Sequence, residues 1–133
     1  MTRPGGPRLL RVRTITGAKA GVLRVLDPLP FVARRFFWLD VPRRASRGGH
    51  AHRTNWQLVV PVRGAVTARC QWYVSRRLRT HAWQLAPGMA LVVPPRVWLD
   101  LTFVTNGVCA VLASEPYDAA EYINDKAELR RLA

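Results

Sequence analysis

Gly49-His50-Ala51-His52-Arg53-Thr54-Asn55-Trp56-Gln57 is the stretch that decides the fold, and Gly64 follows after six intervening residues. Alternate residues of a β-strand project to the same face of the sheet, because the side-chain period of a strand is two. An extended stretch therefore presents the imidazoles of His50 and His52 on one side. Imidazole titrates near physiological pH, at about 6.5 when unperturbed, so a histidine pair in a pocket is suited to general acid/base chemistry.

The spacing from Gly49 to Gly64 resembles the first motif of the cupins, in which two histidines and a carboxylate line the mouth of a β-barrel. A second cupin-like motif is traced by Gly88, Pro94, Trp98 and Leu99. In this resemblance Gln57 stands in place of the carboxylate and Leu99 in place of the last ligand histidine. Two ligands are too few for catalytic zinc or for iron held by two histidines and a carboxylate. We therefore expect no metal and no other cofactor, and histidines that are free to move protons.

Length and composition predict one domain. A chain of 133 residues is long enough for a single core and too short for two. Pro4, Gly5, Gly6 and Pro7 indicate a flexible lead-in over residues 1–8, which leaves a single domain over residues 9–133. Cys70 and Cys109 lie in apolar runs and are expected to be reduced core residues. No apolar run approaches the roughly 18 to 20 residues that span a bilayer, so the sequence predicts a cytoplasmic protein without a membrane partner.

The formal net charge of +13 raises the question of a nucleic-acid partner. The basic residues are spread along the chain, and only Lys19 and Lys126 are lysines. No basic block or basic helix is formed, which argues against DNA or RNA and leaves it a minor alternative. A nucleotide diphosphate needs only a few arginines, whose planar guanidinium groups suit phosphate oxygens.

Short apolar, β-branched and aromatic runs separated by turn residues predict an all-β sandwich or jelly-roll barrel. The runs cover residues 9–12, 22–26, 36–41, 56–62, 65–74, 79–85, 90–93, 99–104 and 108–113. The one helix is expected at the C-terminus, over about Asp118 to Leu132, with Asp118 as its N-cap.

Two longer strings together resemble one family, the dTDP-4-keto-6-deoxyhexose 3,4-ketoisomerases of the WxcM-like cupins. They are Arg47-Gly48-Gly49-His50-Ala51-His52 and Leu112-Ala113-Ser114-Glu115-Pro116-Tyr117-Asp118. Shorter matches are Pro30-Phe31 through Arg34 to Phe36-Phe37, and Val93-Pro94-Pro95-Arg96-Val97-Trp98. The resemblance covers most of the chain from about Gly21 onward. It implies a cupin jelly roll, a homodimer, and a metal-independent isomerase in deoxyamino-sugar biosynthesis.

The reaction implied by the resemblance moves the keto group of a dTDP-linked keto-deoxysugar from C4 to C3 through an enediol. His50 and His52 match the catalytic histidines of the family, with the roles of acid and base left open. The residues matched to substrate binding are Arg34, Arg47, Phe37, Gln57 and Trp98. Family members commonly carry tyrosines where Phe36 and Phe37 stand. A nucleotide-sugar binding cupin without turnover, or an isomerase or epimerase of different regiochemistry, is therefore the alternative.

Overall fold

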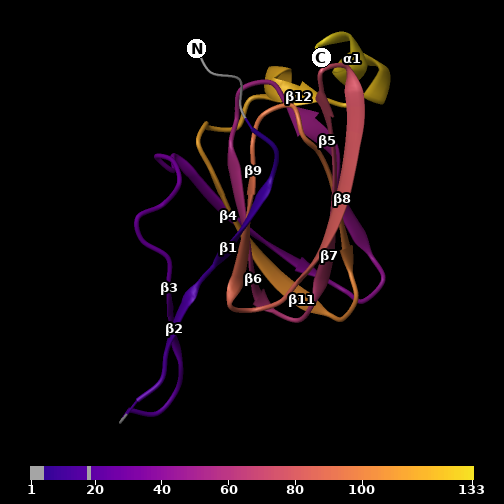
Figure 1. Cartoon of the computed structure of the whole chain (residues 1–133). Coiled ribbons are helices and arrows are strands. Elements are labelled where there is room, and N and C mark those ends of the chain that lie inside the picture. Colours follow the sequence, from indigo (N-terminus) through magenta and orange to yellow (C-terminus); the bar gives the residue numbers. More distant parts are fainter. Residues whose placement is uncertain (1–4, 18) are drawn as a thin grey trace.

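Two five-stranded antiparallel sheets pack face to face in the computed structural model, which describes residues 5–17 and 19–133 (Figure 1). The first sheet contains, in order, β1 (Arg8–Arg11), β9 (Met89–Val93), β6 (Gln57–Arg63), β11 (Gly107–Ala113) and β4 (Arg35–Val41). The second contains β12 (Tyr122–Ile123), β5 (Ser46–His52), β10 (Trp98–Phe103), β7 (Val66–Val74) and β8 (Arg77–Leu85). The predicted all-β fold is confirmed, as a sandwich of two separate sheets.

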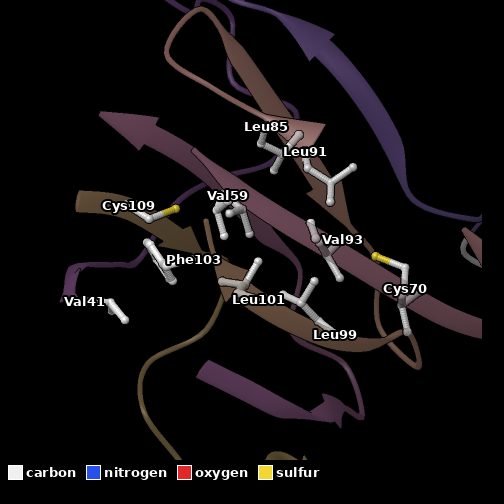
Figure 2. Packing of buried hydrophobic residues seen from close by; sticks show 13 residues of the cluster. Val41, Val59, Cys70, Leu85, Leu91, Val93, Leu99, Leu101, Phe103 and Cys109 are labelled. Atoms are coloured by element: carbon white, nitrogen blue, oxygen red, sulfur yellow. The ribbon is translucent and has the colours of Figure 1, made fainter. Parts of the chain in front are cut away.

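The hydrophobic core lies between the two sheets. Figure 2 shows Val59 and Leu91 of the first sheet converging on Leu99 and Leu101 of the second. The alternation expected of half-buried strands explains this packing, since every second residue of β10 faces inward. Cys70 and Cys109 belong to the same core cluster, as predicted, and are free thiols. Burial raises the pKa of each thiol to about 12, so neither is a nucleophile at neutral pH.

Three strands lie outside the predicted runs: β5, β2 (Arg13–Ile15), and β12, which falls within the expected helix. β5 was missed because half of it is Ser46-Arg47-Gly48-Gly49, which carries no apolar alternation. Gly48 and Gly49 have positive φ angles of 92° and 78°, and the pairing of β5 with β10 shifts register between Leu99 and Asp100. β2 pairs with β3 (Leu23–Val25) in a hairpin that reaches away from the sandwich (Figure 1).

The prediction of one helix from Asp118 to Leu132 was wrong in its extent. The segment contains a 3-10 helix, η1 (Ala119–Glu121), then β12, and then a short helix, α1 (Lys126–Arg131). Asp118 does act as an N-cap, since its side chain accepts a hydrogen bond from the Ala120 amide. The helix is interrupted because Tyr122 and Ile123 pair with β5 instead, which buries Ile123 completely. The short C-terminal helix itself is confirmed.

The expected lead-in over residues 1–8 falls partly outside the described residues, which exclude 1–4. β1 begins at Arg8, and Gly6 lies so close to Trp72 that an added Cβ would come within 2.9 Å of the indole nitrogen. Within residues 5–17 and 19–133, no helix has the length and apolar character needed to cross a membrane.

Candidate active site

β5 places the histidine pair at one end of the sandwich, beside β12 and β10. His52 is the cross-strand neighbour of Tyr122, and His50 is the neighbour of Leu99. The two imidazole rings meet edge to face, with centroids 5.0 Å apart. Ala51, between them, faces the other way, into a cluster formed with Ile123 and helix α1. The strand period thus brings both imidazoles to one side, as the His-x-His spacing requires.

Tyr122 contacts both histidines. Its ring stacks on His50 at 4.6 Å with an angle of 7° between the planes, and it meets His52 edge to face at 4.7 Å. The loop before β6 holds this segment in place, because the Thr54 amide donates to the Glu121 carboxylate at 2.8 Å and the Thr54 hydroxyl contacts the same carboxylate. The C-terminal segment therefore serves as one wall of the histidine site.

A cavity of about 320 Å³ opens beside the pair, between the two sheets. His50 lines it, whereas His52 lies behind His50 and is only 5% exposed. The other predicted residues that line the cavity are Arg47, Phe37 and Gln57. Apolar side chains of the core, including Val59 and Leu101, form its floor. The arrangement is a partly apolar pocket with a few polar groups, which is the usual form of a small-molecule site.

Arg35 lines this cavity, and Arg34 does not. Arg34 is exposed and forms an ion pair with Glu115 at 3.5 Å. The Arg35 guanidinium carbon lies 4.6 Å from the centroid of the Phe37 ring and 5.2 Å from that of Tyr117. These cation–π contacts hold a positive charge at the cavity beside Arg47. The sequence contained the signal for Arg35, since Arg35 and Phe37 are two residues apart on β4 and share its inner face.

Trp98 is the other predicted substrate residue that the structure does not bring to the cavity. It is buried on the opposite face of β10 from Leu99, in the cluster with Ala51, Ile123 and Leu129. The Lys126 ammonium lies 5.4 Å from its ring centroid. The position of Trp98 is that of a packing residue beneath helix α1.

Both histidines are held in the neutral form. Burial lowers the pKa of His50 and outweighs the Gly48 backbone and the Asp100 carboxylate, which raise it. Burial, followed by the charge of His50, lowers the pKa of His52 to about 4, against the opposing charge of Glu121. At neutral pH His50 is therefore an unprotonated imidazole at the wall of a cavity, which is the state required of a general base.

The groups around the histidine pair suit proton transfer better than metal binding. Gln57 and Leu99, at the two positions where a cupin-like site would supply further ligands, both line the cavity. Over the described parts of the chain, no group of three or more His, Cys, Asp or Glu side chains is placed to hold a metal ion. A neutral amide and an aliphatic side chain do not complete the ligand set of a catalytic zinc or non-haem iron site.

Comparison with known proteins identifies the family of the chain. Residues 7–133 match the family described as FdtA: WxcM-like, C-terminal. The chain belongs to this family. A curated relative, the TDP-4-oxo-6-deoxy-alpha-D-glucose-3,4-oxoisomerase of Aneurinibacillus thermoaerophilus, is 31% identical over 98 residues, or 71% of this chain and 68% of the relative. The predicted family membership is confirmed.

Solved structures with the same fold include sugar 3,4-ketoisomerases. A histidine-to-asparagine variant of the 3,4-ketoisomerase QdtA from Thermoanaerobacterium thermosaccharolyticum, in complex with TDP-4-keto-6-deoxyglucose, is 26% identical, with a TM-score of 0.85 over 98% of this chain and 96% of that one. The WlaRB TDP-quinovose 3,4-ketoisomerase from Campylobacter jejuni is 25% identical, with a TM-score of 0.82 over 94% of this chain and 97% of that one. The prediction of an isomerase family is thus confirmed.

Proposed function

We propose that this FdtA-family chain is a sugar 3,4-ketoisomerase that moves the keto group of a dTDP-4-keto-6-deoxyhexose from C4 to C3, in deoxyamino-sugar biosynthesis. The observation that carries the proposal is a neutral His50 at the wall of a cavity that also holds Arg35 and Arg47. The two arginines supply the positive charge that a sugar diphosphate needs. His50 supplies the base.

The proposed reaction is an internal proton exchange. His50 removes the proton from C3 of the sugar while the C4 oxygen gains a proton, which gives an enediol. The hydroxyl on C3 then loses its proton as C4 gains one, so that C3 becomes the ketone and C4 the alcohol. No atom or electron enters or leaves overall. A positioned base of this kind contributes about 10²- to 10⁴-fold to the rate.

His52, Phe37 and Gln57 have supporting roles in the proposal. His52 contacts the His50 ring and completes the acid/base pair. Phe37 and Gln57 line the cavity and are assigned to the sugar or the nucleotide. Arg35, which lines the cavity, takes the substrate-binding role for which the family resemblance suggested Arg34. Because the side chains beside the histidines do not form a metal ligand set, we propose that the reaction needs no metal.

The test is incubation with freshly prepared dTDP-4-keto-6-deoxyglucose in the presence of a chelator, with product analysis by NMR. We expect the 3-keto isomer from the wild-type chain and none from His50→Ala, whose folding is checked by circular dichroism. His81→Ala, an exchange of an exposed histidine on β8, is the matched control. A rise in melting temperature with ligand but no product would instead identify a binding protein without turnover. Full activity of His50→Ala would refute the mechanism.

We propose that the chain acts as a homodimer. The outer face of the first sheet exposes large apolar side chains, including Phe36 at 60%, Trp38 at 64% and Val62 at 59%. A second cavity, of about 400 Å³ and mainly apolar lining, lies on the same face between the β2–β3 hairpin and β6. Apolar area of this kind is typical of a protein interface. In analytical ultracentrifugation the wild type should sediment as a dimer, and Trp38→Ser should form a weaker dimer. A monomeric wild type contradicts the proposal.

A further inference from the structure

Asn55, in the loop between β5 and β6, is buried and has a fixed amide orientation. Its Oδ1 accepts hydrogen bonds from the Glu115 amide at 3.1 Å and from the Ser114 hydroxyl at 3.3 Å. A backbone N–H can only donate, so the side-chain atom that faces it must be the oxygen. The Ser114 oxygen in turn accepts from the Trp56 amide at 2.9 Å, which leaves its proton for Asn55. The Ser114 hydroxyl and the Glu115 amide therefore orient the Asn55 side-chain amide.

The amide nitrogen of Asn55 is consequently the group that faces His52. It lies 3.4 Å from His52 Nδ1, and a carboxamide NH₂ can only donate. His52 Nδ1 must then be the acceptor. In a neutral imidazole only one nitrogen accepts, so the ring proton lies on Nε2. His52 Nε2 is buried and finds no hydrogen-bond partner among the described residues.

The groups packed around His52 are consistent with an uncharged ring. His50 lies beside it on β5, Tyr122 contacts it from β12, and the charged groups that act on it are Glu121 of η1 and Arg35 of β4. The burial of the ring, followed by the charges of His50 and Arg35, opposes protonation, and Glu121 favours it. A donor at Nδ1 also opposes protonation, because the imidazolium needs to donate from that nitrogen.

We propose that Asn55 is a positioning residue that holds His52 as the neutral tautomer with its proton on Nε2. The inference rests on the proposed isomerase function and divides the roles within the pair. His50, at the cavity wall, accepts the proton from the sugar. His52 cannot accept at Nδ1, which Asn55 occupies, and lies beside His50 as a neutral ring that carries its proton on Nε2. Any acceptor for that buried proton comes from outside the described residues, as water or a substrate oxygen.

The tautomer is measured directly by long-range ¹⁵N–¹H NMR of the uniformly labelled protein, in which the two ring nitrogens give distinct shifts. We expect wild-type His52 to show one protonated nitrogen, Nε2, from about pH 8 to about pH 6. Asn55→Asp replaces the donor by an isosteric acceptor, and Asn55→Ala removes it. We expect imidazolium or an Nδ1 proton in the first variant and a mixture of tautomers in the second. Asn106→Asp is the control, since the Asn106 side chain only accepts from the Arg43 amide.

Kinetics supply a second readout that loss of structure would not imitate. In Asn55→Asp we expect kcat to fall about 100-fold, the lower end of what a positioned acid or base contributes, with KM nearly unchanged. The pH profile of kcat should gain an ionisation absent from the wild type and from Asn106→Asp.

Two results would overturn the inference: wild-type His52 protonated on Nδ1 or charged at neutral pH, or a single Nε2–H tautomer retained in both Asn55 variants. The first result is measured on the wild type alone, so it can refute the inference even if the Asn55 variants fail to fold. An inactive wild type with the expected tautomer would refute the proposed function and leave the tautomer assignment standing.

Discussion

Acid should destabilise the folded chain through His52. Burial and the charge of His50 lower the pKa of this imidazole to about 4, whereas the unfolded chain titrates at about 6.5. Between these values the unfolded state binds a proton that the folded state does not. The stability contribution of neutral His52 is therefore complete above about pH 6.5, falls as the pH falls, and is fully lost below about pH 4. The difference corresponds to about 3 kcal/mol of unfolding free energy.

The assay is urea denaturation of the wild type and of His52→Gln, whose side chain stays neutral at every pH. Carboxylates such as Glu121 also titrate in acid. Burial raises the Glu121 pKa, but hydrogen bonds from the Thr54 side chain and neighbouring amides lower it by more. Because both proteins retain these carboxylates, the difference between their free energies of unfolding isolates His52. From about pH 7.5 to about pH 4.5 we expect the wild type to lose about 2 to 3 kcal/mol relative to the variant.

A difference that stays constant across this range would show that His52 is no harder to protonate in the folded chain, and the argument from burial would fail. His81→Gln controls for the exchange itself, because it removes an exposed histidine on β8. Equal m-values for the three proteins are needed, since a changed m-value reports a change in the denatured or native ensemble.

Three further predictions concern the cavity and its support. Arg35→Ala should raise KM for the dTDP-sugar by about 10- to 100-fold, because it removes a hydrogen bond to a charged group, whereas Arg34→Ala should change KM by less than about threefold. Equal effects of the two variants in steady-state kinetics would contradict the placement of Arg35 at the substrate. Trp98→Ala should lower the free energy of unfolding in urea titration by about 3 to 5 kcal/mol, because it empties a buried site under helix α1. A change in KM without a loss of stability would instead indicate that Trp98 contacts the substrate. Gly48→Ala should destabilise the fold by more than about 1 kcal/mol, because the residue has a φ of 92° and its Cβ would lie 2.5 Å from the Leu99 carbonyl oxygen; an unchanged melting temperature would be the contrary result.

The sequence was sufficient for the fold class and for the location of the histidine site. Both the alternation of apolar residues along the strands and the motif from Gly49 to Gly64 are patterns of residues close together in the sequence. Such patterns can be read without knowledge of the tertiary structure. The alternation of β4 would also have indicated that Arg35, and not Arg34, lines the cavity. Phe37 faces inward, and residues two apart on a strand share a face. The matched family position favoured Arg34 instead, one residue away and on the other face.

The remaining features depend on contacts between distant segments, which spacing along the chain does not encode. Asn55 and Ser114 are 59 residues apart, and their hydrogen bond exists only because β6 and β11 pair. β12 forms because Tyr122 and Ile123 find an edge of β5, and that tertiary pairing overrides the helical pattern expected from Asp118 onward. The same pairing seats Tyr122 against both histidines and in the wall of the cavity. A residue of the C-terminal segment is therefore part of the site, although the sequence predicted a helix there.

The two phenylalanines at positions matched to tyrosines in the family are not equivalent in the fold. Phe36 faces outward from β4 and is 60% exposed, so a hydroxyl there would lie outside the cavity. Phe37 lines the cavity and contacts the Arg35 guanidinium, so only its missing hydroxyl affects the site. Tyr122, which also lines the cavity and stacks on His50, still provides a phenol beside the proposed base. The substitution therefore removes one polar contact from the pocket and leaves the histidines, both cavity arginines and a tyrosine in place, which favours turnover over simple binding.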